Sequence, residues 1–245
     1  MIYTVNRSSV SYGETIGILL LENFVPFIPG DTANATTYRY PVRFQRVPGL
    51  SVERIFNHDL SMYQILKEKA VSLYEEGVKA ITGDCGFMAV YQKQLAADMD
   101  IPVFLSSLLQ IPFMLSIIGG TDSISIITAN SRSLTSDLLE NLDVTEKMRS
   151  RIHIVGLEDC REFVEAVFEE KGTLDSEKVE KCVVEHSLTA VRDCPSTKAI
   201  LLECSLLPPY AHRVAEATGL PVFDYITMID YVHDALIKRR YTGHM

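Results

Sequence analysis

The sequence predicts an α/β protein of two related lobes, each with a doubly wound parallel sheet, and a cleft between the lobes. The first observation behind this prediction is an internal repeat. Residues 79–104, KAITGDCGFMAVYQKQLAADMDIPVF, align without a gap to residues 198–223, KAILLECSLLPPYAHRVAEATGLPVF. The offset is constant, since 204 − 85 = 119 and 221 − 102 = 119, and it is nearly half of the 245 residues. The second observation is that apolar runs of strand length alternate with amphipathic runs of helical length.

The first lobe is predicted to comprise residues 1–117 together with residues 225–245. Its first strand is the apolar run 15–21, TIGILLL, and a loop at 24–41, rich in Pro, Asn, Asp and Thr, follows it. A helix is expected over 58–76, ending at Gly77. The first repeat copy then supplies a strand ending at Ile81, a helix to Met99 and a short strand that opens at Pro102.

The second lobe is predicted over residues 118–224, after a break at Gly119-Gly120. Strands are expected at 123–128 and 152–156, and helices at 158–170 and 176–191. The second repeat copy supplies a strand ending at Leu202, a helix to Thr218 and a strand from Pro221. A last helix within 226–240 is expected to return and cover the first lobe.

Composition and charge exclude several functional classes. Apolar residues make up 47% of the chain and charged residues 22%, as in ordinary globular proteins, and the net charge of −9 argues against a nucleic-acid partner. The uncharged stretch 101–121 contains two prolines and is not expected to span a membrane. The run 16–21 is flanked by glutamates and does not resemble a signal peptide, and the five cysteines form no C-x-x-C pair, so a reduced, cytoplasmic location is expected.

No cofactor or metal is expected. Neither a G-x-G-x-x-G nor a G-x-x-x-x-G-K-[ST] motif is present. Cys182 and His186 have a spacing that could hold a metal, but no third ligand lies nearby in sequence, so a packed or surface pair is favoured. Cys160 and Cys194 have no counterpart in the repeat and receive no role.

Cys85 and Cys204 occupy equivalent positions, each at a strand-to-helix junction. Free backbone N–H groups at such a junction favour negative charge, so a lowered thiol pKa is expected there. The alternative is a pair of inert, buried thiols. Asp84 and Glu203 precede the cysteines and are interpreted as structural, because neighbouring residues at a strand end usually point to opposite sides.

Polar residues near the predicted cleft are candidates for ligand binding. In the loop 24–41, Asn34 and Thr36 are expected to contact a ligand as the loop closes over the cleft; a solvated loop with Asx turns is the alternative. Asn130 and Ser131 stand where the first strand of the second lobe meets its helix, and they suit either anion binding or capping.

A thiol from each lobe facing one small acid suits proton exchange at a carbon centre, since one face needs a base and the other an acid. Two sulfur atoms that reach one carbon from opposite faces should lie roughly 6–8 Å apart.

The motifs GDCGF around Cys85, ECSLLPPY around Cys204 and SIIT-ANS at 125–131 resemble those of the cofactor-independent aspartate/glutamate racemase superfamily. That superfamily includes hydantoin racemase, maleate isomerase and arylmalonate decarboxylase, and the resemblance covers essentially the whole chain. It implies two pseudo-symmetric Rossmann-like lobes with the active site between them, and Cys85 and Cys204 as the catalytic pair. It also implies that the following residues bind the substrate carboxylate: Gly86, Phe87, Ser205, Leu206, Thr128, Asn130 and Ser131.

The residues after the cysteines depart from the superfamily pattern. Glutamate and aspartate racemases typically have Asn-Thr after the first cysteine and Thr-His or Thr-Glu after the second, where this chain has Gly-Phe and Ser-Leu. A more apolar pocket than aspartate requires is therefore expected.

Three functions follow from this reasoning. The first is a racemase or epimerase, an isomerase acting on a small carboxylic acid through both thiols, without cofactor or metal. The second is a related lyase, resembling arylmalonate decarboxylase, or a cis–trans isomerase resembling maleate isomerase, in which one cysteine dominates. The third is a non-catalytic module that binds a small acid. The expected partner is a small carboxylate substrate, and a homodimer or higher homo-oligomer is compatible with the sequence.

Overall fold

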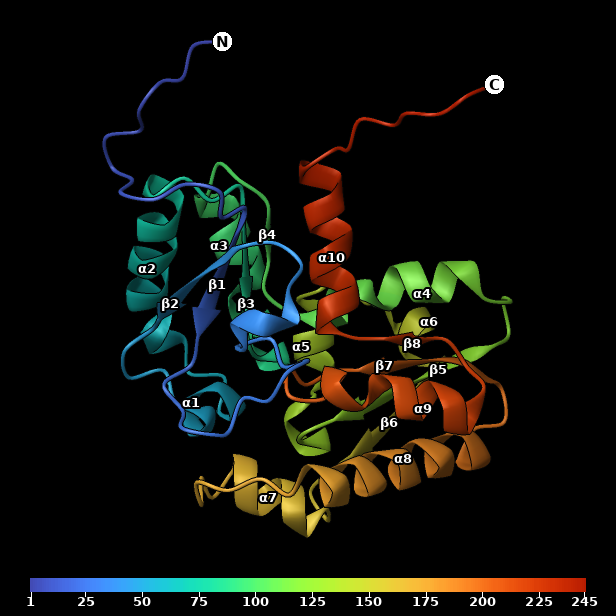
Figure 1. Ribbon diagram of the computed structural model, residues 1–245. Helices are drawn as coiled ribbons and strands as arrows, with labels where there is room; N and C mark the ends of the chain where they lie inside the picture. Colours follow the sequence, from blue (N-terminus) through green and yellow to red (C-terminus); the bar gives the residue numbers. More distant parts are fainter.

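The computed structural model describes residues 1–245 and contains two four-stranded parallel sheets. The strand order is β2-β1-β3-β4 in the first sheet and β6-β5-β7-β8 in the second, so the order is the same in both halves. Helices flank the sheets, and the two lobes lie side by side (Figure 1). This architecture confirms the predicted α/β fold with two duplicated lobes.

In the first sheet β1 is central and pairs in parallel with β2 and β3. The strands and helices of this part of the chain are β1 Ile16–Leu20, β2 Val42–Arg46, α1 Val52–Phe56, α2 Tyr63–Glu75, β3 Ala80–Gly83, α3 Gln92–Asp98, β4 Val103–Phe104 and α4 Ile111–Ile117. Short 3₁₀ turns are η1 Ala35–Thr37, η2 Leu60–Met62, η3 Gly86–Tyr91 and η4 Ser107–Gln110.

In the second sheet β5 takes the place of β1 and pairs in parallel with β6 and β7. Its strands and helices are β5 Ser123–Thr128, α5 Ser136–Glu140, α6 Glu146–Arg149, β6 Ile152–Gly156, α7 Arg161–Val167, α8 Ser176–Asp193, β7 Thr197–Leu202, α9 Ala211–Thr218 and β8 Val222–Phe223. The 3₁₀ turns are η5 Ser131–Ser133 and η6 Pro208–Tyr210, and α10 Tyr225–Leu236 follows β8.

The predicted strands are all present, but β2 was missed. Its sequence, VRFQR, lies at the edge of the sheet, and its residues are half-buried or exposed. Polar side chains are tolerated on such an edge, so the apolar signal of a central strand is absent there. In each repeat copy the helix also begins later than predicted, because a 3₁₀ turn follows the cysteine.

The last helix, α10, returns to the first lobe, where it stands against the sheet (Figure 1). Tyr225, Met228 and Ile229 are buried against Ile16 and Ile18 of β1. The helix begins with a capping box at Asp224, whose side chain accepts a hydrogen bond from the Thr227 N–H. The exact lobe boundaries at residues 117 and 224 stay a prediction.

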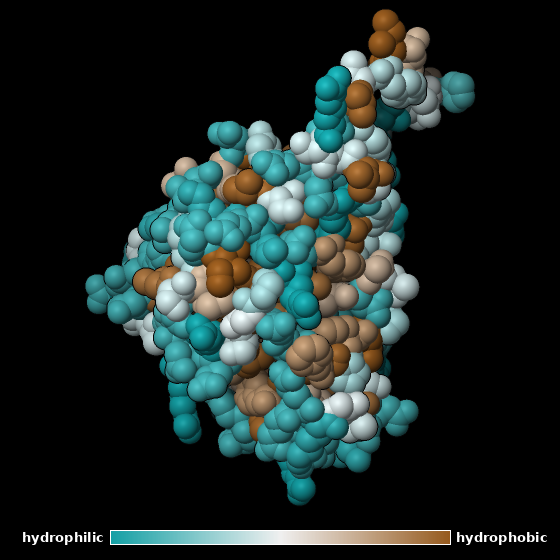
Figure 2. All heavy atoms as spheres, turned by 90° about the vertical axis from the view of Figure 1, so that its left-hand side faces the viewer, coloured by the Kyte–Doolittle hydropathy of each residue, from teal (hydrophilic) through white to brown (hydrophobic).

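One continuous core joins the two lobes. A cluster of 30 buried residues includes Leu19 and Ile81 from the first sheet and Ile124, Ile126 and Leu201 from the second. The outer side of the first lobe is covered largely by hydrophilic residues with small apolar patches between them (Figure 2). No helix combines the length and apolar character needed to cross a membrane.

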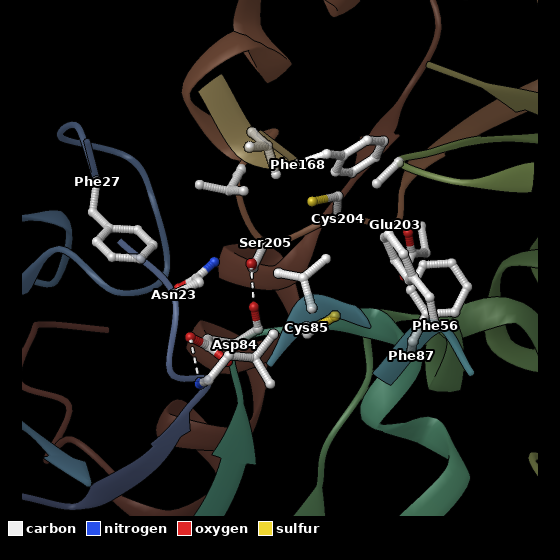
Figure 3. Close-up of a pocket in the computed structure, with 15 residues that line it drawn as sticks. Asn23, Phe27, Phe56, Asp84, Cys85, Phe87, Phe168, Glu203, Cys204 and Ser205 are labelled. Atoms are coloured by element: carbon white, nitrogen blue, oxygen red, sulfur yellow. Dashed lines mark hydrogen bonds between the residues drawn. The ribbon is translucent and has the colours of Figure 1, made fainter. Parts of the chain in front are cut away.

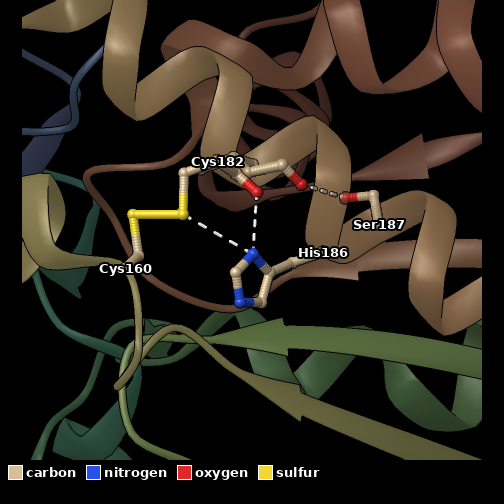
Figure 4. Close-up of a disulfide and its surroundings, with 5 residues drawn as sticks. Cys160, Cys182, His186 and Ser187 are labelled. Carbon is tan, nitrogen blue, oxygen red and sulfur yellow. Dashed lines mark hydrogen bonds between the residues drawn. A yellow bond between two sulfur atoms is a disulfide. The ribbon is translucent and has the colours of Figure 1, made fainter.

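A disulfide links Cys160, which precedes α7, to Cys182 in α8 (Figure 4). The two Cα atoms are 6.2 Å apart, a usual separation for a disulfide, and Nδ1 of His186 lies 2.8 Å from the carbonyl oxygen of Cys182. The sequence predicts no role for Cys160 and a packed or surface pair for Cys182 and His186, so this disulfide is a correction. The pairing was missed because the two cysteines share no sequence motif and meet only through the packing of α7 on α8.

Reducing this disulfide is expected to lower the free energy of unfolding by about 3 kcal/mol, since the bond closes a loop between residues 22 apart. Thermal melts with and without a dithiol reductant measure the effect. The Cys160→Ser/Cys182→Ser variant should match the reduced protein and show no response to the reductant. Equal melting temperatures in both conditions would contradict the structural role of the bond.

Candidate active site

A pocket lies where the carboxyl ends of the two sheets meet (Figure 3). Residues that directly follow β1, β3, β5 and β7 contribute to it, which is the edge where parallel α/β sheets bind ligands. About 30 Å³ of it is enclosed, and the space not occupied by atoms reaches about 420 Å³ when the open mouth is included. Its lining residues are Leu21, Asn23, Phe27, Val52, Phe56, Asp84, Cys85, Phe87, Ala129, Val167, Phe168, Glu203, Cys204, Ser205 and Leu206.

The pocket contains one thiol from each lobe, Cys85 and Cys204. The two occupy equivalent positions, because each lies two residues beyond the end of its strand, β3 or β7. Cys85 is half-buried and Cys204 is buried. The repeat therefore brings two equivalent thiols to one pocket, and their assignment as the catalytic pair stays a prediction.

The lowered thiol pKa expected from the sequence is wrong. Burial raises the pKa of both Cys85 and Cys204 well above the ordinary thiol value, and the Glu203 carboxylate raises each further. The backbone N–H groups of Phe87 and Leu206 lower the pKa of Cys85 and Cys204, respectively, but their influence is smaller than that of burial. The effect of burial on the thiol pKa is larger than the effect of the backbone N–H, so both thiols are protonated in the empty pocket.

The interpretation of Asp84 and Glu203 as side chains that turn away from the thiols is also corrected. Both carboxyl groups line the pocket, and burial raises the pKa of each to about 7. Both residues follow the last residue of their strand, where the strict alternation of side chains no longer applies. Asp84 does have a structural contact, because its carboxyl accepts the N–H of Leu21 at 3.0 Å.

Phenylalanine rings form much of the wall. Phe56 packs edge-to-face on Phe87 and on Phe168, with ring centroids 5.1 Å and 5.4 Å apart, and Phe27 lies on the opposite side (Figure 3). No lysine, arginine or histidine is among the lining residues. The more apolar pocket expected from the sequence is present, and its only ionisable side chains are acids and thiols.

The loop 24–41 reaches from the first lobe to the second. The N–H of Thr32 donates to the carbonyl of Ser205 at 3.3 Å, and Phe27 enters the pocket wall. Asn34 and Thr36 lie outside the lining residues and bind each other, with the Thr36 N–H donating to Asn34 Oδ1 at 2.8 Å. Their contact with a ligand stays a prediction.

The remaining candidates for substrate binding occupy different places. Phe87 and Ser205 line the pocket, and the Ser205 hydroxyl donates to the backbone carbonyl of Asp84, which ties the lobes together. Gly86, Thr128, Asn130 and Ser131 do not line the pocket. The Thr128 hydroxyl donates to Glu203, Asn130 caps η5, and Ser131 donates to Glu158. Substrate binding by any of these six residues stays a prediction.

Sequence reasoning did not single out Asn23, Phe56 or Phe168. Phe56 and Phe168 lie in apolar stretches of the sequence, where a phenylalanine of the pocket cannot be distinguished from one of the hydrophobic core. Asn23 directly follows the first predicted strand, and that position was the one signal that could have identified it.

Comparison with known proteins places the chain in a family. No protein-family model matches it. A dimethylsulfoniopropionate lyase of Durusdinium sp. clade D is 34% identical over 222 residues, covering 89% of this chain and 73% of that protein. The chain belongs to the dimethylsulfoniopropionate lyase family. Dimethylsulfoniopropionate lyase 5 of Emiliania huxleyi (strain CCMP1516) is 33% identical over 228 residues, and the match covers 90% of this chain but only 45% of that protein.

Solved structures agree on the fold. Allantoin racemase from Klebsiella pneumoniae superposes with a TM-score of 0.65 at 14% identity, covering 94% of this chain and 97% of that one. A Gly74Cys variant of arylmalonate decarboxylase superposes with a TM-score of 0.57 at 15% identity, covering 94% and 97%. The chain therefore has the fold of the aspartate/glutamate racemase superfamily, as the sequence motifs indicated.

The racemase function and the isomerase class predicted from the sequence are wrong. The relatives that share about a third of their residues with this chain are lyases, whereas the racemases resemble it only in fold. The duplicated cysteines led to the racemase interpretation, because two equivalent thiols suit a two-sided proton transfer. The relatives agree better with the second function considered, a related lyase in which one cysteine dominates.

Proposed function

We propose that this protein is a lyase that cleaves dimethylsulfoniopropionate into dimethyl sulfide and acrylate. The observation that carries the proposal is the family relationship at 34% identity over 89% of the chain. The composition of the pocket supports it independently. Acids, thiols and phenylalanine rings line the pocket without any basic side chain, which suits a cationic ligand.

The two ends of this substrate differ in charge. Its sulfonium group is a soft cation that aromatic rings and carboxylates stabilise, and the pocket offers Phe56, Phe87 and Phe168. Its carboxylate needs hydrogen-bond donors. We assign that role to the backbone amide of Ser205, which follows the second cysteine, together with the side-chain amide of Asn23.

The reaction is an elimination. A thiolate, from Cys85 or Cys204, removes a proton from the carbon next to the carboxylate, a carbon–carbon double bond forms, and the carbon–sulfur bond breaks. The electron pair of that bond leaves with dimethyl sulfide. The leaving group is neutral and needs no proton, so the reaction requires one base and no general acid. The reaction thus leaves the thiol protonated, as it is in the empty pocket, and it gives up this proton to solvent when the next substrate cation binds.

Substrate binding itself can produce the base. The thiols are protonated in the empty pocket because burial disfavours their charged form. A sulfonium cation beside them favours the thiolate, since opposite charges attract strongly in a medium of low polarity. The pocket would therefore activate a thiol only when a cation occupies it.

The purified protein is expected to release dimethyl sulfide and acrylate in equal amounts from dimethylsulfoniopropionate. Headspace gas chromatography measures the first product and proton NMR the second. The same NMR samples, prepared in heavy water with allantoin, aspartate and glutamate, control for racemisation by following deuterium at the alpha carbon. Absence of dimethyl sulfide at any pH between 5 and 9 would overturn the proposal.

A further inference from the structure

Glu203 lines the pocket and has one buried carboxyl oxygen without a hydrogen-bond partner. Its side chain is fully buried, and Oε2 accepts a hydrogen bond from the Thr128 hydroxyl at 2.8 Å. The other oxygen, Oε1, has no hydrogen-bond partner. Burying an acceptor without a partner costs free energy, so an unpaired carboxyl oxygen in a pocket wall indicates that its partner is a ligand.

The equivalent residue in the first lobe, Asp84, does not share this property. The backbones correspond, since the N–H of Asp84 donates to the Leu19 carbonyl and that of Glu203 donates to the Ile127 carbonyl. The side chains differ, because both oxygens of Asp84 lie within 3.2 Å of the Leu21 N–H. A glutamate is one methylene longer, which carries its second oxygen beyond the end of its own strand. The pseudo-symmetry of the pocket is broken at this position.

The first lobe makes room for this longer side chain. A Cβ atom on Gly86 would overlap Oε1 of Glu203, so the carboxyl group lies directly against the Gly86 backbone. Gly86 follows Cys85 and opens η3, which places the unpaired oxygen beside the first-lobe thiol. Glu203 thus crosses the cleft between the lobes.

We propose that the Glu203 carboxylate is the counter-ion for the onium group of the ligand. This role deepens the proposed lyase function and rests on it for the identity of the substrate. The recognition itself extends to any small sulfonium or quaternary ammonium ion, which would meet the same carboxylate and the same phenylalanine rings.

Cation binding should be linked to proton release. Burial raises the pKa of Glu203 to about 7, and a cation beside the carboxyl group favours its ionised form. The titratable groups that face Glu203 are Asp84, Cys85, Cys204 and Tyr225, and none of them is basic. Burial keeps the two thiols and the phenol protonated, whereas the pKa of Asp84 is also about 7. Affinity should therefore rise with pH through about 7.

Calorimetric titration of the full chain with trimethylsulfonium tests this linkage without turnover. Binding is expected to be about tenfold tighter at pH 8 than at pH 6. Measurements in two buffers of different ionisation enthalpy should show that Glu203 releases about 0.9 proton per cation at pH 6 and about 0.1 at pH 8, and any thiolate that forms adds to both values. Dimethyl sulfoxide, which is pyramidal and neutral, is the matched ligand control and should show no proton release.

Three variants distinguish the effect of the Glu203 charge on cation binding from the effects of neighbouring residues. Glu203→Gln keeps the shape and the acceptor for Thr128 but removes the charge, and it should weaken trimethylsulfonium binding about 30-fold or more. Asp84→Asn removes the equivalent charge and should stay within about threefold of the unmodified protein. Gly86→Ala keeps both charges but displaces the Glu203 carboxyl group, and it should weaken binding about tenfold or more.

Unchanged affinity in Glu203→Gln, or an equal loss in Asp84→Asn, would overturn the assignment. If Glu203→Gln does not fold, as judged by its thermal melt, Gly86→Ala carries the same test and unchanged affinity there overturns the assignment. The proposed function fails separately: proton-linked onium binding without release of dimethyl sulfide contradicts the lyase but supports the counter-ion. Release of dimethyl sulfide with full onium affinity in Glu203→Gln contradicts the counter-ion alone.

Discussion

Serine at Cys85 or Cys204 is expected to lower the rate of dimethyl sulfide release unequally, by about 10³-fold or more in one variant and by about tenfold in the other. The reason is chemical. Elimination requires one base, and a serine hydroxyl cannot replace a thiolate in that role. The second thiol lines the same pocket, but the reaction needs no proton from it, because dimethyl sulfide leaves as a neutral molecule.

The measurement is kcat for each single variant and for the double variant, which should be no slower than the worse single variant. Cys194→Ser is the matched control, since this third free thiol lies outside the pocket. Equal, complete loss in both pocket variants would show that both thiols act in the reaction, and the single-base mechanism would then be wrong.

Tyr225→Ala is expected to destabilise the fold by about 3–5 kcal/mol. Tyr225 is fully buried at the start of α10, and its hydroxyl donates to the Leu105 carbonyl at 2.8 Å. The variant loses this hydrogen bond and leaves a cavity between α10 and the first sheet. The free energy of unfolding, from urea titration followed by circular dichroism, measures the effect, and the melting temperature should fall by about 10 °C.

Tyr231→Ala is the control on the same helix, because this tyrosine is 75% exposed. Its effect should stay within about 0.5 kcal/mol. Similar stabilities for the two variants would show that α10 is not an integral part of the first lobe, and the predicted division of the chain would lose its support.

The repeat around Cys85 and Cys204 was the most informative part of the sequence. Two aligned copies imply two copies of one topology, and the carboxyl ends of central parallel strands meet ligands in such folds. Placing the two thiols in one pocket therefore required no knowledge of side-chain packing. The predicted central strands are likewise correct, because buried parallel strands are continuous apolar runs.

The chemistry of the site depended on burial, which a linear sequence does not contain. The pKa shift of each pocket thiol was predicted in the wrong direction. The strand-to-helix pattern indicates a nearby backbone N–H, which lowers the pKa, but it does not indicate the burial that raises it. The reaction type was also wrong, because equivalent thiols suit a racemase and a lyase alike.

The duplicated α/β architecture and the two cysteines at equivalent strand ends could be predicted from the sequence, because both follow from local periodicity and a repeat that aligns without a gap. Three other features could not: the pairing of Cys160 with Cys182, the wall that phenylalanines from distant segments share, and the reach of Glu203 across the cleft to Gly86. These contacts join residues far apart in the chain. They depend on how the lobes pack against each other, and no local pattern encodes that packing.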